Sequence, residues 1–493
     1  MSEGIHLPPQ PHIRACDRTA SMPFRSNYRH EQANGRTRVS VRNAKKAAIA
    51  AFFLCPAPPA AAHEASGGLV LLLPTGNTMV GAAAAVAASA LLLAIAPRLK
   101  SPRLVLPLRM PALPEMPVSV LSTLFVLMLI WIGRTGPDDP LSNPIGYGVW
   151  TLGWICMSLF AAVFGNPWPW CNPWTGLLAL IGNRPRFALP EGAAGWIACG
   201  QFLIFAWIDL ISPYNMDPER LAIYLAVYWA ANLIAMALFG STWFGRAEPL
   251  GLFFRLLGRL SSFGRDGHGR LTLTLPGARA SEEPPPDRGE TAFVLLALSS
   301  ASFDGLADTF RWLTVIGVNP LEFPGRSEVE EANTIGLLGA WAVLSILYLG
   351  TVRAGEALAG VRVPGLAARL VVSLLPILVV FHAAHFTVRL IMDGQYLWRI
   401  ASDPLVRGWD LFGTAHYHVS ASMFSDPARV ALVWAFQTGV ITLGHIVGIA
   451  IAHAVAMRAL PDPRRAVLSQ LPLATLMVAY TVFGLWLLAA PKI

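Results

Sequence analysis

Residues 366–392 read LAARLVVSLLPILVVFHAAHFTVRLIM, an apolar stretch that is long enough to span a bilayer. The stretch carries two histidines, His382 and His385. Ionisable side chains inside a membrane span are costly, which makes them a functional-site hypothesis by default. Their i,i+3 spacing places both imidazoles on one helix face, within reach of one shared ion or partner. The stretch therefore predicts a transmembrane helix and the place of a site within it.

The composition of the whole chain is that of a polytopic membrane protein. Hydrophobic residues make up 54% and charged residues 13% of the 493 residues, whereas soluble domains carry about 25% charged residues. Because apolar runs of about 20 residues recur along the chain, we expect an all-α transmembrane helical bundle of about ten spans. The expected spans are 77–96, 118–133, 146–165, 192–212, 220–243, 291–311, 332–352, 366–392, 429–457 and 467–490.

The N-terminal region has the features of a targeting segment. A basic region at residues 36–46 precedes a short apolar core at residues 47–60, and three alanines at 60–62 offer a cleavage site. We therefore assign residues 1–62 to a leader with a cleaved signal peptide and residues 63–493 to the transmembrane domain.

Basic side chains are concentrated in the loops that face the cytoplasm if the mature N-terminus is periplasmic. The longest of these loops, the cytoplasmic loop 245–290, holds seven arginines, while most acidic residues lie in the opposite loops. This positive-inside bias predicts a multi-pass protein of the bacterial inner membrane. The bias also explains the net charge of +8, so nothing calls for nucleic acid as a partner. Within this loop, LFFRLLGRL at 252–260 is amphipathic and is expected to lie along the inner surface.

Polar residues of several predicted spans lie at mid-depth or in the outer half of the membrane. This asymmetry predicts one polar cavity that opens outward, bordered by the periplasmic loop 393–428. The spans contribute Asp209, Asp304, His382, His385, Arg389, Asp393, Gln437 and His445, and the loop contributes His416 and His418.

Imidazoles and carboxylates together suit a divalent ion such as zinc, manganese, iron or copper. A bound ion lowers the pKa of its water to about 7 and makes hydroxide available near neutral pH. The predicted ligands are His382 and His385, with one of His416 or His418, and a carboxylate such as Asp304. The remaining candidates are Asp209, Asp393, Gln437 and His445, together with His63, whose free amine and imidazole could bind copper after cleavage at residue 62.

Two other interpretations of the paired histidines stay open. Histidines inside a helical bundle often hydrogen-bond to neighbouring helices and have no further role. Facing histidines from the eighth and ninth spans, such as His382 and His445, could instead bind haem.

Stretches spread over residues 63–493 resemble a family of bacterial polytopic membrane proteins labelled fenitrothion hydrolase. They include NPWTG at 172–176, SFDGLADTF at 302–310, VNPLEFPGRS at 318–327, HAAHF at 382–386 and GWDLFGTAHYHV at 408–419. The resemblance implies hydrolysis of a lipophilic organophosphate triester with release of a phenol, and it supplies no catalytic residue.

In the resulting hypothesis a metal ion holds the phosphoryl oxygen and supplies hydroxide. Asp304 acts as a ligand or base, and Arg389 stabilises the developing charge. The same cavity would also suit transport or handling of a metal ion of the copper type, with His63 as the entry ligand. A haem-bearing electron-transfer protein is the third function class, and a homo- or hetero-oligomer is compatible with all three.

Overall fold

The computed structural model of the chain describes residues 75–95, 102–109, 114–182, 184–323 and 325–492. The chain divides into two units, 1–63 and 64–493, and every described residue belongs to the second unit. The expected leader 1–62 and His63 lie outside the described residues, so the signal peptide stays a prediction.

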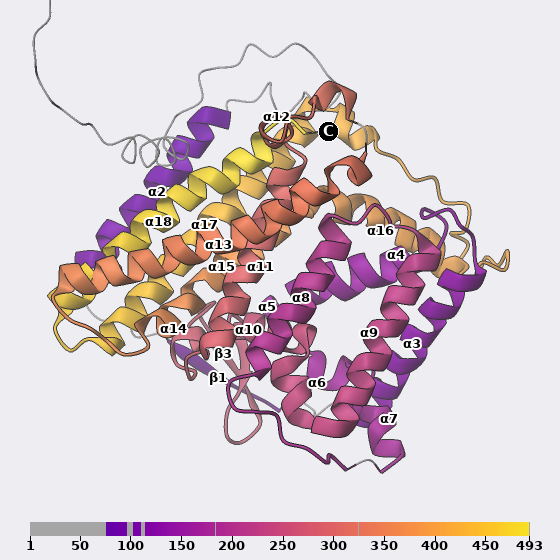
Figure 1. Ribbon diagram of the computed structural model, residues 1–493, viewed down its shortest axis with the longest axis horizontal. Coiled ribbons are helices and arrows are strands. Elements are labelled where there is room, and N and C mark those ends of the chain that lie inside the picture. Colours follow the sequence, from indigo (N-terminus) through magenta and orange to yellow (C-terminus); the bar gives the residue numbers. More distant parts are fainter. Residues whose placement is uncertain (1–74, 96–101, 110–113, 183, 324, 493) are drawn as a thin grey trace, which may run out of the picture. The chain divides into compact units, whose positions relative to one another are not determined.

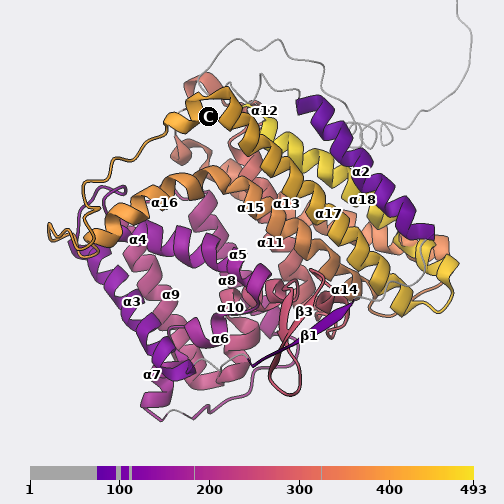
Figure 2. The same ribbon diagram turned by 180° about the vertical axis from the view of Figure 1, so that it is seen from behind.

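The described part of the chain contains nine helices that are long and apolar enough to cross a membrane, which confirms a helical membrane protein (Figures 1 and 2). They are α2 (Thr75–Ile95), α3 (Glu115–Thr135), the continuous segment Pro144–Phe164, α9 (Pro218–Phe239), α11 (Arg288–Ala307), α13 (Arg326–Ala359), the continuous segment Leu366–His385, α17 (Pro427–Ala459) and α18 (Pro463–Ala489). A tenth apolar helix, α8 (Ala194–Leu210), coincides with the predicted span 192–212 but has only 17 residues.

Two of these segments change helix type along their length, and shorter elements connect the others. Segment 144–164 consists of α4 (Pro144–Gly146), the π-helix η2 (Tyr147–Cys156) and α5 (Met157–Phe164), and segment 366–385 of α14 (Leu366–Leu370), the 3₁₀-helix η6 (Val371–Leu374) and α15 (Leu375–His385). The connecting helices are α6 (Trp168–Cys171), α7 (Thr175–Leu180), η3 (Trp243–Ala247), α10 (Pro249–Gly258), η4 (Arg279–Ser281), α12 (Phe310–Val315), η5 (Pro320–Glu322), α16 (Thr387–Ser402) and η7 (Ser422–Ser425).

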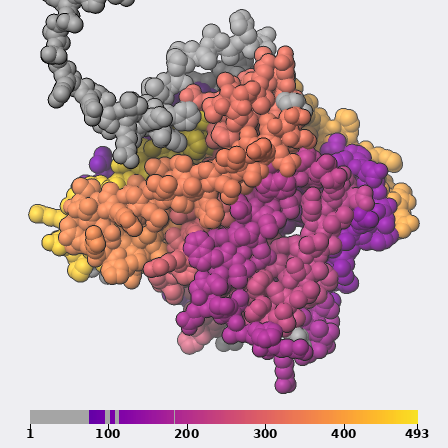
Figure 3. Space-filling model, viewed as in Figure 1, coloured from indigo at the N-terminus to yellow at the C-terminus, as the bar shows by residue number. Residues whose placement is uncertain are grey.

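Large apolar side chains remain exposed on the outer helices, as expected where a helix faces lipid. In α13, which forms an orange band across the face seen in Figure 3, Ile346 is 70% exposed. Val80 of α2, Leu121 of α3 and Val227 of α9 are exposed to a similar degree. Contiguous apolar surface of this kind marks a lipid or protein contact rather than water.

The loops that carry the arginines meet at one end of the helices. Strand β1 (Arg103–Arg109) pairs with β3 (Arg270–Thr274), and β3 pairs with β2 (Phe263–Arg265), in an antiparallel three-stranded sheet. Arg103 and Arg458, from two other predicted cytoplasmic loops, both form ion pairs with Glu282. The predicted cytoplasmic loops thus share one end of the bundle.

The predicted periplasmic loops meet each other in the same way. Arg134, at the end of α3, forms an ion pair with Glu219 at the start of α9. The guanidinium of Arg407, beyond α16, lies 5.6 Å from the ring centroid of Trp131 in α3. These contacts agree with the alternation of sides that the charges predict, while the choice of which end faces the cytoplasm stays a prediction.

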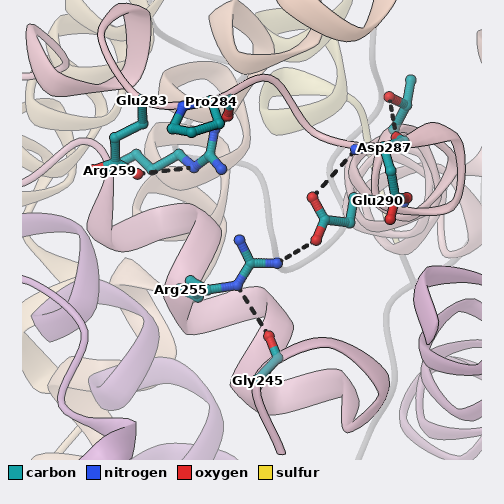
Figure 4. Close-up of polar contacts among 8 residues, drawn as sticks. Gly245, Arg255, Arg259, Glu283, Pro284, Asp287 and Glu290 are labelled. Atoms are coloured by element: carbon teal, nitrogen blue, oxygen red, sulfur yellow. Dashed lines mark hydrogen bonds and ion pairs between the residues drawn. The ribbon is translucent and has the colours of Figure 1, made fainter. Parts of the chain in front are cut away.

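Helix α10, within the segment 245–290, is folded into the interior, so the prediction that 252–260 lies along the inner surface is wrong. Leu252, Phe253 and Phe254 of α10 are almost completely buried. The charges of α10 have partners within the protein: Arg255 pairs with Glu290 in the first turn of α11, and Arg259 pairs with Glu283 (Figure 4). Arg259 also donates to Pro284 O. An amphipathic pattern shows that a helix has one polar face. It does not show whether that face contacts lipid headgroups or carboxylates within the protein.

Close glycine packing fixes α8 against α11, the two helices that border the site described below. A Cβ atom at Gly195 would lie 2.6 Å from both Glu290 N and Gly289 C, far inside van der Waals contact. Small residues at a crossing let two transmembrane backbones approach closely. The crossing brings the N-terminal end of α8 against that of α11.

The first prediction concerns this crossing. Gly195→Ala should lower the apparent Tm of the purified protein in detergent, because overpacking of this kind costs about 1–3 kcal/mol. Gly200→Ala is the matched control in the same helix, because a Cβ atom there meets nothing within 4 Å. Equal melting curves for the two variants would contradict the tight crossing.

Candidate functional site

Two of the predicted site residues, His385 and Asp304, contact each other directly. His385 Nε2 donates to Asp304 Oδ2 at 2.8 Å. His385 is the last residue of α15, and Asp304 lies in the last turn of α11. Their side chains are 19% and 22% exposed, which leaves the pair partly screened from solvent.

A cavity of about 30 Å³ lies beside this pair and extends to three further polar residues. That volume is roughly the space of one water molecule in the liquid. The polar lining consists of Asp209, Ser300, Asp304, His382 and His385. Most of the remaining wall is aromatic and comes from Trp154, Phe202, Phe205, Phe253, Phe381 and Phe386.

His382 is buried in this wall, 4% exposed, with its ring edge-on to Trp154 at a centroid distance of 5.1 Å. His382 Nε2 has no hydrogen-bond partner among the described residues, and the same holds for Ser300 Oγ. An unpaired buried polar atom costs about 1–3 kcal/mol. Both atoms belong to side chains that line the cavity, so a water molecule or ion there would relieve the cost for both.

The π-helix η2 is a fourth element that contributes to this site, in addition to α8, α11 and α15. It carries Trp154 to His382, and its Thr151 Oγ1 donates to Asp393 Oδ2. π-Helical segments are rare and are frequently found at functional sites. Trp154 is not among the site residues predicted from the sequence, because a change from α to π register leaves no periodic signal.

Ser300 was also missed, although the sequence held a signal for it. Ser300 lies four residues before Asp304, a spacing that places the two side chains on one face of a helix. The neighbouring residues of α11 include two more serines, Ser299 and Ser302, whose hydroxyls donate to backbone carbonyls of their own helix. Ser300 is the serine of this run that lines the cavity.

Arg389, Asp393 and Gln437 lie near the site but do not line its cavity. Arg389 Nε lies 3.2 Å from Asp393 Oδ2, one turn further along α16. Gln437 of α17 donates to Ala384 O at 2.9 Å and so joins α17 to the histidine helix. Arg389 and Asp393 thus form their own ion pair.

The structure does not bring the loop histidines to the buried pair. His416 and His418 are exposed, and neither lines the cavity. Helix α16 continues to Ser402, which shortens the predicted loop 393–428. Within that loop, a backbone hydrogen bond from Ala415 and one from the Ser402 hydroxyl lower the pKa of Asp410.

His445 is also separate from the site. It is 2% exposed within α17, and its Nδ1 lies 2.8 Å from Ile441 O. It does not line the cavity that His382 borders. The facing histidines expected for haem are therefore not found at this cavity.

The carboxylates of the site have positive neighbours from the C-terminal end of the chain. Phe310 N donates to Pro491 O at 3.1 Å, and Thr309 and Lys492 form a bridge beside it. Burial lowers the pKa of Lys492, and the negative charges of Asp304 and Asp308 act in the opposite direction. Lys492 thereby offsets part of the negative charge at the end of α11.

Comparisons with known proteins add no assignment to this geometry. Family models, curated proteins and solved structures were all searched, and none matches the chain. The resemblance to membrane proteins labelled fenitrothion hydrolase therefore stays a prediction from the sequence.

The second prediction concerns the buried pair. Asp304→Leu alone should lower the apparent Tm more than Asp304→Leu combined with His385→Leu. Removing one partner leaves the other partly buried and unpaired, whereas replacing both partners of a buried pair by apolar residues is often nearly neutral. Thermal unfolding of the three purified proteins in detergent measures this, and additive losses in the double variant would show that the contact carries no coupling.

Proposed function

We propose that the chain is a ten-span protein of the bacterial inner membrane that hydrolyses lipophilic organophosphate triesters at the Asp304–His385 pair. In this proposal α8 is the tenth span and the mature N-terminus is periplasmic. The observation that supports hydrolysis most is the 2.8 Å contact between His385 and Asp304 beside a cavity the size of one water molecule.

An imidazole held by a carboxylate is a suitable general base for the activation of water. Asp304 binds Nε2 and leaves His385 Nδ1 as the nitrogen that takes the proton. A water molecule held by His382 Nε2 and Ser300 Oγ would satisfy the two unpaired atoms of the cavity. The resulting hydroxide attacks phosphorus, the bond to the aryloxy group breaks, and the proton on His385 passes to the departing phenol oxygen.

In this proposal Arg389 stabilises negative charge at the site without lining the cavity. Its guanidinium is bound to Asp393, yet its charge acts on Asp209 in the cavity wall. Negative charge that develops on the phosphoryl oxygen would experience the same field.

The aromatic lining suits the aryl group of a triester, but the cavity must open to admit one. Pockets for drug-sized ligands measure about 300–1,000 Å³, whereas this cavity measures about 30 Å³. Substrate binding thus requires aromatic walls such as Phe205 and Phe386 to move apart.

The divalent metal ion expected from the sequence stays a prediction. His382, His385, Asp209 and Asp304 line one cavity, but within the described ranges no group of three or more His, Cys, Asp or Glu side chains is placed to hold a metal. The donor set as it stands does not fit a metal centre, so the hydrolytic step above uses only side chains and water.

The third prediction tests hydrolysis. Purified full-length protein should release a phenol from an aryl phosphotriester. Asp304→Asn and His385→Gln should each lower kcat about 10²–10⁴-fold, because general-base catalysis contributes that much. His416→Gln combined with His418→Gln is the control and should keep wild-type kcat, because neither histidine lines the cavity. Absence of turnover by wild-type protein, or equal kcat in all variants, would sink the proposal.

A second candidate function is the binding or transport of a metal ion, and the small volume of the cavity favours it. About 30 Å³ is enough for an ion without its hydration shell. The imidazoles and carboxylates of the lining would have to move closer together to replace that shell, because they are not placed to hold a metal as they stand.

The fourth prediction separates this candidate from hydrolysis. Under ion binding, wild-type protein should carry a copper, zinc or manganese ion that His382→Ala combined with His385→Ala lacks, and should cleave no ester. Elemental analysis of the two purified proteins measures the difference. The same metal content in both would exclude these histidines as ligands, with His445→Ala as the control for loss of a buried histidine.

A further inference from the structure

A second cavity, with a volume of about 610 Å³, lies at the C-terminal end of α13. Its lining consists of Arg353, Glu356, Ala357, Gly360, Val361 and Arg362. Helix α13 ends at Ala359, and Gly360 takes the left-handed conformation, with φ of 64°, that reverses the chain there. The turn brings Arg362 back to the same cavity as Arg353.

The cavity carries an excess of unpaired positive charge. Arg353 and Arg362 are exposed, and neither guanidinium has a hydrogen bond or ion pair among the described residues. The one acidic residue of the lining, Glu356, is already engaged, because its Oε1 accepts from Val363 N at 3.0 Å. Two arginines offer ten N–H donors in a geometry that suits phosphate oxygens.

Apolar side chains adjoin the cavity, both in the protein interior and along the exposed face of α13. Val361 and Val363 pack against a buried cluster formed by the adjoining ends of α17 and α18, which includes Leu460 and Ala466. Along α13, Leu349 and Ile346 lie one and two turns before Arg353 on the same face and are 42% and 70% exposed. The arginines suit the phosphate headgroup of a phospholipid, and the exposed apolar stripe beside them suits its acyl chains.

We propose that the cavity at the end of α13 binds the phosphate headgroup of an anionic phospholipid, whose acyl chains lie along the exposed stripe of α13. Basic pockets between transmembrane helices are a known form of such recognition. The cavity belongs to the end of the bundle where the predicted cytoplasmic loops meet, so the lipid would come from the inner leaflet. This site is independent of the hydrolytic site and of its reaction.

The experiment measures lipid retention by the full-length protein. Native mass spectrometry in detergent, with added phosphatidylglycerol or phosphatidylcholine, should show preferential binding of phosphatidylglycerol to wild-type protein. Arg353→Gln combined with Arg362→Gln should weaken that binding about 30-fold, because each arginine near anionic lipid contributes about a factor of five. Unchanged thermal unfolding in phosphatidylcholine confirms that this variant is folded.

The control removes the same charge from the same end of the protein. Arg369→Gln combined with Arg464→Gln leaves the cavity lining intact and should keep the affinity within about twofold, a change below the contribution of one arginine. Equal binding of the two lipids, or equal losses in the two double variants, would overturn the proposal. Glycerol phosphate distinguishes the source of the phosphate: stabilisation by this soluble anion as strong as that by phosphatidylglycerol would overturn a lipid occupant.

Discussion

The polar centre of this bundle depends on the contact between His385 and Asp304. Ionisable side chains are expensive inside a membrane unless they are paired or hydrated. The pair joins α15 to α11, and Asp209 of α8, which packs against α11, lies in the same cavity wall. His382 and Ser300 are left with unpaired atoms. The polar side chains thus enclose a small cavity, but two of their atoms lack a hydrogen-bond partner. A water molecule in the cavity would supply both partners.

The apolar stretch 366–392 is less uniform than one helix. It starts as α14, tightens into η6, continues as α15 and breaks at Phe386 before α16. The break separates His382 and His385 from Arg389 and Asp393, although the four residues would follow one another along a continuous helix. Arg389 pairs with Asp393, its i,i+4 neighbour in α16, and does not line the cavity.

The sequence was sufficient for features that depend on length, hydropathy and charge. These include nine of the helices expected as spans, the shared end of the arginine-rich loops and the grouping of Asp304, Asp209, His382 and His385 around one cavity. It failed where local periodicity does not determine the outcome. The π-helical register that turns Trp154 toward His382 leaves no periodic pattern in the sequence. The burial of α10 involves an ion pair between Arg255 and Glu290, which are 35 residues apart, and local sequence does not reveal such a partner. The exposed His416 and His418 show that a position on the same predicted side of the membrane does not imply contact.

The glycine crossing of α8 and α11 bears on how the chain enters the membrane. Helix α8 has 17 residues, near the lower limit of length for a span, and Cys199 contacts Gly289 across 90 residues of sequence. During synthesis α8 emerges well before the helix that covers its glycine face. The position of α8 in the bundle then depends on a helix that is synthesised later, because α11 supplies the surface on which the glycine face of α8 packs.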